Sequence, residues 1–314
     1  MSRDLPRAIA LMGPTASGKT RLAVELAQAL DGEIISVDSS LVYRGMDIGT
    51  AKPSLDERQG VPHHLIDLIE PAESFSTGEF RRRALALMAD IHQRGRLPIL
   101  AGGTMLYFNC LFNGLASLPE ADEETRRRID AEARDLGWEH MHRLLAKVDP
   151  TAASRIHPND PQRIQRALEV YRLTGVPISE LQRQAKTEAP PFEFIRLVLA
   201  PSDRERLGRR IRERFQLMLE MGLMEEVRAL YRRGDLNLDM PSMRAVGYRQ
   251  TWLHLLGELA YEEMIERAVI ATRQFAKRQY TWLRRETSAT WFDNEQQDLL
   301  GNTLTLIRGQ TDCG

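Results

Sequence analysis

The sequence predicts an α/β protein, with a parallel sheet flanked by helices and an inserted all-helical subdomain. A glycine-rich loop joins a short apolar run to an amphipathic helix near the start of the chain. Apolar, strand-like runs then alternate with helical segments through about residue 114, as a helix-covered parallel sheet requires. The stretch 115–191 has only helical character. We therefore expect one domain from residues 1–114 and 192–314, and a helical insertion at 115–191.

The first predicted strand is the apolar run 8–12, which leads directly into GPTASGKT at 13–20. This octapeptide fits G-x-x-x-x-G-K-[ST], in which backbone N–H groups at a helix start surround a phosphate. The following TRLAVELAQAL carries leucines at helical spacing, so strand, loop and helix occur in the required order. The pattern predicts a P-loop NTPase-like fold. The expected phosphate-binding residues are Gly13, Pro14, Thr15, Ala16, Ser17, Gly18, Lys19 and Thr20, with Lys19 as the cation and Thr20 as a Mg²⁺ ligand.

Further strands are predicted at GEIISVDSS, which ends at Asp38, and at RLPILAGGT, which ends at Gly102, Gly103 and Thr104. FIRLVLAP and ATWFD supply later strands. In open α/β sheets, ligands bind outside the carboxyl ends of the strands. We therefore expect the glycine loop, Asp38 and Thr104 to converge on one crevice.

Helices are expected in ADEETRRRIDAEARDLGWEHMHRLLAKV and in DPQRIQRALEVYRLTG, the latter beginning with Asp160 and Pro161 and ending at Gly175. Three more helical stretches follow the insertion: DRERLGRRIRERFQLMLEMG, SMRAVGYRQTWLHLL and YEEMIERAVIATRQFAKRQYTWLRR. The tail after Gly301 carries no clear signal.

Bulk composition indicates a globular protein, because 42% of the 314 residues are hydrophobic and 28% are charged. No apolar run is long enough to span a bilayer, and the first residues lack the apolar segment of a signal peptide. We expect a cytoplasmic, monomeric protein. Cys110 and Cys313 lie far apart without C-x-x-C spacing, which argues against a disulfide framework and a cysteine-rich zinc site. A net charge of −1 by itself argues against nucleic-acid binding.

The glycine loop leaves two classes of function open. A small-molecule kinase or ATPase normally needs an acidic Mg²⁺ ligand at the end of a later strand, but LPILAGGT ends in glycines and threonine. Asp38 could serve instead. The second class is a nucleic-acid-modifying transferase that uses the loop for a diphosphate leaving group. Three basic clusters favour this second class, since arginine and lysine contact phosphates and aromatic rings stack on bases. The clusters are Arg163, Arg166 and Arg172; Arg244, Tyr248 and Arg249; and Lys277, Arg278, Tyr280, Trp282, Arg284 and Arg285. The alternative interpretation is solvated helix faces with core aromatics.

Six stretches make a resemblance specific: GPTASGKT, SVDSSLVYRGMDIGTAKP, AGGTMLYF, HPNDPQRIQRALEVYRLTG, MRAVGYRQ and ATRQFAKRQYTWLRR. Over roughly residues 8–285 the chain resembles the bacterial tRNA dimethylallyltransferase family, also called tRNA isopentenyltransferases. The C-terminal zinc finger of eukaryotic relatives is not expected here. The resemblance implies transfer of a dimethylallyl group from dimethylallyl diphosphate to N6 of adenosine 37, beside the anticodon of tRNAs that read codons beginning with U.

The resemblance also implies residue roles. Asp38 is expected to accept the proton from N6, with a helix cap or a second-shell Mg²⁺ ligand as alternatives, and Asp47 and Asp67 as weaker candidates. Arg214 is expected to reach the diphosphate, and Thr104 to orient Asp38 or the amine. His63, His64 and His157 are interpreted as structural, because no matching ligand set accompanies them.

The partner implied by the resemblance is the tRNA anticodon stem-loop. Four family stretches and two single residues are expected to hold the flipped base and its neighbours. They are Asp38, Ser39, Ser40 and Leu41; Gln162, Arg163, Ile164, Gln165 and Arg166; Arg244, Ala245, Val246, Gly247, Tyr248 and Arg249; Lys277, Arg278, Gln279, Tyr280, Thr281, Trp282, Leu283 and Arg284; with Thr104 and Arg126.

Overall fold

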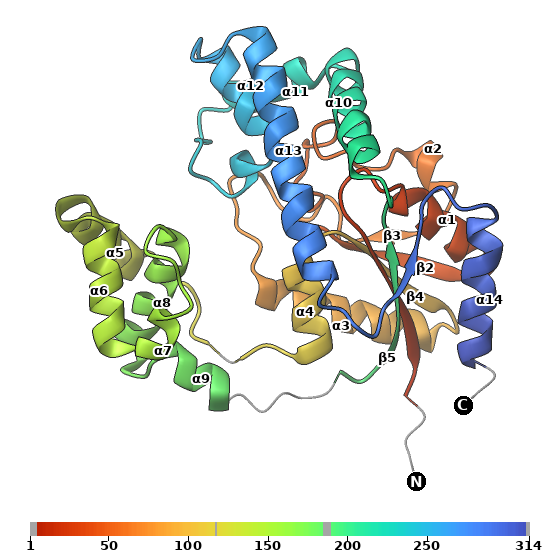
Figure 1. The fold of residues 1–314 in the computed structure, drawn as a ribbon, viewed down its shortest axis with the longest axis horizontal. Coiled ribbons are helices and arrows are strands. Elements are labelled where there is room, and N and C mark those ends of the chain that lie inside the picture. Colours follow the sequence, from red (N-terminus) through yellow and green to blue (C-terminus); the bar gives the residue numbers. More distant parts are fainter. Residues whose placement is uncertain (1–4, 117, 185–189, 312–314) are drawn as a thin grey trace. The chain divides into compact units, whose positions relative to one another are not determined.

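The computed structural model describes residues 5–116, 118–184 and 190–311, and it divides into two compact units (Figure 1). The α/β unit comprises Met1–Phe112 and Pro190–Gly314, and the helical unit comprises Asn113–Ala189. Each unit has its own hydrophobic core, as its size allows.

The sheet of the α/β unit is six-stranded, with every neighbouring pair parallel and the order β3-β2-β4-β1-β5-β6. The strands are β1 Arg7–Met12, β2 Gly32–Val37, β3 His63–His64, β4 Leu97–Gly102, β5 Glu193–Leu199 and β6 Thr290–Phe292. The predicted α/β class and the five predicted strands are confirmed. The two-residue β3 was not predicted, because it is too short to carry a periodic pattern.

Helices surround this sheet and continue beyond its carboxyl edge (Figure 1). They are α1 Lys19–Ala29, α2 Leu55–Arg58, α3 Thr77–Gln93, α4 Met105–Asn113, α10 Arg204–Glu220, α11 Leu223–Arg232, the 3₁₀ turn η1 Ser242–Arg244, α12 Tyr248–Leu255, α13 Tyr261–Leu283 and α14 Leu299–Thr311. The C-terminal helix α14 was not predicted, because the residues after Gly301 carry no clear signal.

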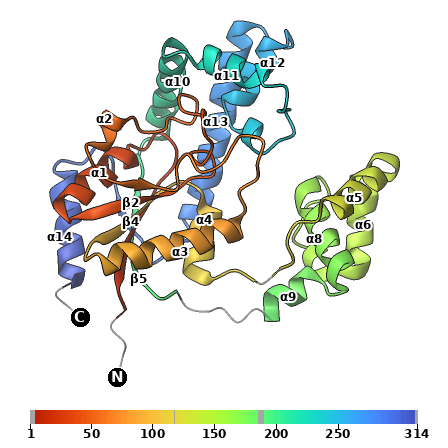
Figure 2. The ribbon, with the colours of Figure 1, turned by 180° about the vertical axis from the view of Figure 1, so that it is seen from behind.

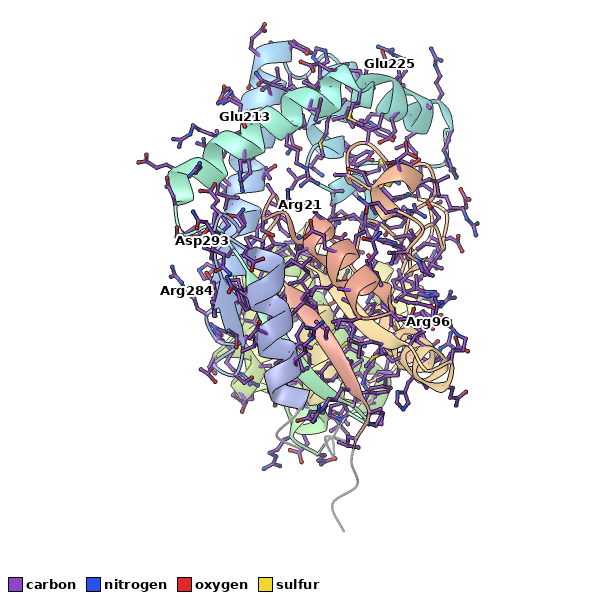
Figure 3. All side chains as sticks on the ribbon, turned by 90° about the vertical axis from the view of Figure 1, so that its right-hand side faces the viewer. Arg21, Arg96, Glu213, Glu225, Arg284 and Asp293 are labelled. Carbon is purple, nitrogen blue, oxygen red and sulfur yellow. The ribbon has the colours of Figure 1, made fainter. Side chains whose placement is uncertain are left out.

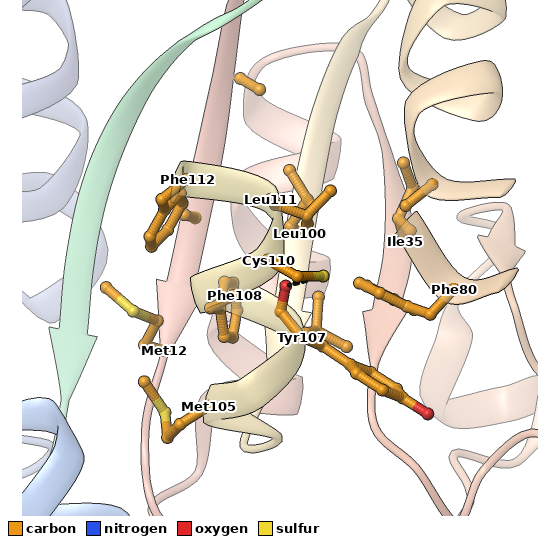
Figure 4. Close-up of a cluster of buried hydrophobic side chains, with 14 of the residues drawn as sticks. Met12, Ile35, Phe80, Leu100, Met105, Tyr107, Phe108, Cys110, Leu111 and Phe112 are labelled. Carbon is orange, nitrogen blue, oxygen red and sulfur yellow. Dashed lines mark hydrogen bonds between the residues drawn. The ribbon is translucent and has the colours of Figure 1, made fainter. Parts of the chain in front are cut away.

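Both faces of the sheet are buried, which explains the continuous apolar runs of its strands. Successive residues of β1 point to opposite faces: Ala10 and Met12 join a core with α3 and α4, while Ile9 and Leu11 join a core with α1 and α14. Seen from behind, α3 and α4 cover the first face (Figure 2). The rings of Phe80 and Tyr107 stack there at 4.1 Å between centroids (Figure 4). The strands are thus held from both sides.

The helical unit contains α5 Glu123–Leu136, α6 Trp138–Val148, α7 Pro150–Ala153, α8 Pro161–Thr174 and α9 Ile178–Gln184. Gly137, at φ 82°, divides the helical stretch 121–148 into α5 and α6. Asp160 caps α8 by accepting from the Arg163 backbone N–H at 3.2 Å, and Gly175 ends it at φ 69°, as predicted. Buried Ile129, Met141, Leu145, Ile164 and Leu168 form the core of this unit.

Candidate active site

The phosphate-binding loop turns tightly between β1 and α1. Gly18 has φ 86° and Ala16 has φ 61°, both in the left-handed region. A Cβ on Gly13 would overlap the Leu199 carbonyl oxygen of the neighbouring strand β5. The first glycine is therefore required by close strand packing, and the second by backbone conformation.

Lys19 lies at the start of α1 and points back into the loop, where Nζ donates to the Pro14 carbonyl at 3.1 Å. Burial lowers the pKa of Lys19 to about 8; Arg214 acts in the same direction, and Asp38 opposes both. The three side chains are therefore within electrostatic reach of one another. Thr20, the next residue of the helix, is exposed.

Two side chains from distant elements hold the loop. Gln279 of α13 accepts from the Thr15 backbone N–H at 2.9 Å, and Asn294, just after β6, donates to the Ser17 carbonyl at 2.9 Å. The Thr15 N–H is consequently engaged by protein in this structure. Sequence reasoning assigned Gln279 to RNA and missed Asn294, although its position just beyond a strand's carboxyl end could have indicated it.

Asp38 and Thr104 meet at the carboxyl ends of β2 and β4. The Thr104 N–H donates to the Val37 carbonyl at 3.1 Å, and Thr104 Oγ1 accepts from the Ser39 N–H at 3.0 Å. Asp38 Oδ1 accepts from the Ser40 N–H at 2.8 Å, a turn that fixes its half-buried carboxylate. The structure therefore brings Asp38, Thr104 and the loop together at one edge of the sheet.

The weaker carboxylate candidates have other partners. Asp47 and Asp67 both form ion pairs with Lys52, whose side chain is only 4% exposed. A buried ammonium needs such partners, so these two carboxylates stabilise their own loop.

Arg214 approaches the loop from α10. Its side chain is half-buried and forms no hydrogen bond or ion pair with another residue in the described part of the chain. Burial lowers the pKa of Arg214, while Asp38 and Glu57 oppose that change. A guanidinium left in this position attracts an anion.

A cavity of about 370 Å³ lies beside the loop. Figure 3 shows α10 passing above the start of α1, with Arg21 between them. The lining includes the backbone of the loop and three arginines, namely Ala16, Ser17, Gly18, Arg21, Arg210 and Arg214. The Ser17 hydroxyl is fully buried there without a hydrogen-bond partner among the described residues. The cavity therefore has the positive charge to attract a phosphate.

Among the residues expected to hold tRNA in the α/β unit, six are exposed: Ser39, Arg244, Lys277, Arg278, Thr281 and Arg284. Ser40, Leu41, Ala245, Val246, Arg249, Tyr280 and Trp282 are partly buried. Tyr248 and Leu283 are fully buried, and Gln279 is 4% exposed. The expectation that these three side chains contact RNA directly is corrected, because they pack inside the protein. Tyr248 donates to Glu226, and Gly247, also buried, begins its helix α12.

In the helical unit, Gln162 and Arg163 are exposed, whereas Ile164 is a core residue with no exposed surface. Gln165 donates to Asp130 at 2.6 Å. Arg126 and Arg166 both donate to Glu169, which is fully buried. Burial opposes ionisation of Glu169, but hydrogen bonds from the two arginines outweigh it and hold its pKa below the usual range. The expectation that the Ile164 side chain contacts RNA is therefore corrected. Arg126 and Arg166 have a structural role, because both bind Glu169.

The described residues contain no group of three or more His, Cys, Asp or Glu side chains that could hold a metal by themselves. His64 instead bonds Glu33 at 2.7 Å, and His63 bonds the Val61 carbonyl. None of the described helices is long and apolar enough to cross a membrane.

The chain is similar to proteins of known activity. A family model described as IPP transferase matches residues 41–286. A tRNA dimethylallyltransferase of Methylococcus capsulatus is 64% identical over 307 residues, covering 98% of each chain. The crystal structure of a full-length tRNA isopentenylpyrophosphate transferase from Bacillus halodurans is 41% identical, with a TM-score of 0.73, and the match covers 98% of this chain and 97% of that one.

A eukaryotic dimethylallyltransferase, whose structures are described as snapshots of the enzyme acting on tRNA, is 30% identical with a TM-score of 0.80. That match covers 96% of this chain and 78% of the eukaryotic chain. The predicted family is thereby confirmed, and its solved members share the fold described above. This chain belongs to the IPP transferase family.

Proposed function

We propose that this protein transfers the dimethylallyl group from dimethylallyl diphosphate to N6 of adenosine 37 in tRNAs that read codons beginning with U. The products are N6-(dimethylallyl)adenosine and diphosphate. The observation that carries the proposal is that Lys19, Asp38 and Arg214 interact electrostatically at the carboxyl edge of the sheet. The reaction needs cations for the diphosphate leaving group and a proton acceptor for the amine, and these three side chains supply both. The tRNA dimethylallyltransferase that is 64% identical supports the same reaction.

The loop side of the site stabilises the departing diphosphate. N6 attacks C1 of the allyl group, the C1–O bond breaks, and the electron pair leaves with the diphosphate. Negative charge grows on that group in the transition state, so the Lys19 ammonium, the Arg214 guanidinium and the remaining loop N–H groups bind it more tightly there than in the ground state. The exposed residue Thr20 would supply a hydroxyl ligand to a Mg²⁺ ion bound with the diphosphate. Such an ion neutralises diphosphate charge when bound.

Asp38 accepts the N6 proton on the opposite side of the reacting carbon. The exocyclic amine is a poor nucleophile because its lone pair is delocalised into the ring, and alkylation leaves a proton that must be removed. Proton transfer to a positioned carboxylate contributes about 10²- to 10⁴-fold in rate. Thr104, bonded to the Ser39 N–H at 3.0 Å, keeps the segment that follows Asp38 in place.

The anticodon stem-loop is the proposed RNA partner. Its unpaired adenosine leaves the stack at a cost of a few kcal/mol, less than for a paired base. The proposed phosphate contacts in the α/β unit are the exposed Lys277 and Arg278 of α13, Arg284 just after that helix, and Arg244. Gln162 and Arg163 are the proposed contacts in the helical unit. We further infer that the protein is cytoplasmic and monomeric. Light scattering after gel filtration tests the oligomeric state.

The kinase alternative is not favoured. It rested on the phosphate-binding loop, and the relative that is 64% identical, over 98% of this chain, is a tRNA dimethylallyltransferase. A kinase normally also needs an acidic Mg²⁺ ligand at the end of a later strand, but β4 ends at Gly102 and is followed by Gly103 and Thr104, so Asp38 would have to serve instead.

Mass spectrometry of digested nucleosides tests the proposal. Unmodified tRNA incubated with the protein, dimethylallyl diphosphate and Mg²⁺ should give N6-(dimethylallyl)adenosine, and an anticodon-loop digest should place it at position 37. A parallel incubation with ATP in place of dimethylallyl diphosphate should leave both ATP and tRNA unchanged. Unmodified tRNA with rapid tRNA-dependent ATP hydrolysis would overturn the proposal.

A further inference from the structure

One buried amide connects the two halves of the site. Gln279 lies on α13 with only 4% of its surface exposed. Its Oε1 accepts from the Thr15 N–H of the phosphate-binding loop at 2.9 Å, and its Nε2 donates to the Gly103 carbonyl at 2.8 Å. Gly103 immediately precedes Thr104. A single side chain is thus bonded to the loop and to the strand end that carries Thr104.

The Gln279 amide satisfies both partners. The Thr15 N–H can only donate and the Gly103 carbonyl can only accept, so the side chain between them must offer one acceptor and one donor. A carboxylate of the same length would lose the second bond, and an apolar side chain would lose both. A Cβ on Gly103 would overlap Gln279 Nε2 and lie 3.1 Å from the Gly13 carbonyl oxygen. The glycine therefore leaves the space that the amide occupies.

The position of Gln279 on its helix separates it from the RNA-facing residues. Ala276 and Leu283 are buried on the same side of α13, whereas Lys277, Arg278 and Thr281 are exposed. With 3.6 residues per turn, Gln279 faces the protein interior. Its hydrogen bonds are consequently to protein backbone, although it sits within a stretch expected to hold tRNA.

We propose that Gln279 is a positioning residue that holds the phosphate-binding loop in register with the end of β4. The proposal rests on the proposed function, in which the diphosphate sits on the loop and the acceptor adenine reaches Asp38 and Thr104. Alkylation needs the nucleophile and the breaking C1–O bond in line, and a displacement of about 1 Å can reduce the rate about 10²-fold. Fixing the loop relative to the strand end fixes that alignment.

The test compares Gln279→Leu and Gln279→Glu with Gln274→Leu, a matched control at an exposed position of the same helix. Steady-state kinetics give kcat and the KM for dimethylallyl diphosphate, and filter binding gives the Kd for tRNA. Both Gln279 variants should lose about tenfold or more in kcat/KM for dimethylallyl diphosphate, with the tRNA Kd within about twofold of wild type. Gln274→Leu should match wild type in all three values.

A binding measurement separates this proposal from the proposed function. Calorimetric titration with inorganic pyrophosphate and no tRNA should show weaker binding by both Gln279 variants, whether or not the wild-type protein modifies tRNA. Absence of tRNA modification by wild type would overturn the proposed function alone. Should Gln279→Leu fail to fold, Gln279→Met provides the same loss of both hydrogen bonds in a flexible side chain.

Two results would overturn the role of Gln279. The first is kinetics and pyrophosphate binding indistinguishable from Gln274→Leu. The second is a tRNA Kd weakened about tenfold with kcat and pyrophosphate binding unchanged, which would make Gln279 an RNA contact.

Discussion

The arginines around Glu169 in the helical unit and Arg214 in the α/β unit are used in opposite ways. In the helical unit, Arg126 and Arg166 bind the buried carboxylate of Glu169, and Arg172 forms a two-point ion pair with Glu132. In the α/β unit, Arg214 faces the phosphate-binding loop with no ion pair to another described residue. The first set completes a fold, and the second leaves its charge for a ligand.

The difference shows that a basic cluster in a sequence does not reveal its own role. When a guanidinium moves away from a buried carboxylate, the carboxylate is left as an unpaired buried charge. The function of such an arginine is therefore structural. A half-buried guanidinium without a carboxylate partner costs desolvation energy that a bound anion offsets.

Arg214→Ala should lower kcat by about 10²- to 10³-fold at saturating tRNA, because it removes a charge that stabilises the leaving group. The tRNA Kd should stay within about twofold of wild type. Arg212→Ala is the matched control, since Arg212 lies on the same helix and pairs with Glu266. Steady-state assays in both substrates make the comparison. Equal losses in the two variants would mean that Arg214 supports the helix instead of the diphosphate.

Arg166→Ala should lower the free energy of unfolding by about 2 kcal/mol. Breaking a buried ion pair typically costs roughly 3–5 kcal/mol, and here Arg126 remains to bind Glu169. Arg163→Ala, at a side chain that is 67% exposed, should change it by less than about 0.5 kcal/mol. Urea denaturation followed by circular dichroism measures both. An unchanged stability for Arg166→Ala would remove the structural half of the contrast.

The pH dependence of kcat/KM for dimethylallyl diphosphate should report Lys19. Burial lowers its pKa to about 8 in the free protein, so the ammonium is charged below that pH and loses its proton above it. The kcat/KM value should therefore fall above about pH 8, by up to about tenfold per pH unit. Lys19→Arg keeps its charge across that range, so whatever its absolute rate, its profile should lack this fall. Identical profiles would assign the fall to another group.

Lys277→Ala with Arg284→Ala should weaken tRNA binding severalfold and reduce the slope of log Kd against log salt by about 1.4–1.8, at about 0.7–0.9 per lost phosphate contact. Arg172→Ala, which removes an ion-paired arginine, should leave the slope unchanged. Filter binding across a salt series gives the values. A full wild-type slope in the double variant would show that α13 does not contact phosphates.

Much of the fold and part of the site could be predicted from the sequence, because their signals are local. Apolar runs mark the strands, and GPTASGKT fixes the turn from β1 to α1. Parallel topology then brings Asp38 and Thr104 together regardless of their separation in sequence. The residues that support the site and the helical core could not be predicted. Gln279 bonds Thr15, which is 264 residues away in the sequence, and Glu169 becomes buried only when the helices pack. Basic clusters are equally visible whether their partner is Glu169 or RNA.

We infer that Asp38 takes the N6 proton at a site whose RNA affinity comes from other residues. Single-turnover prenylation by Asp38→Asn, with the tRNA Kd measured on the same preparation, tests it most directly. Asp47→Asn is the control, because Asp47 is paired with Lys52. We expect a rate at least about 10²-fold below wild type for Asp38→Asn, with the tRNA Kd within about twofold. A near-wild-type rate, or a loss of tRNA binding in proportion to the loss of rate, would contradict it.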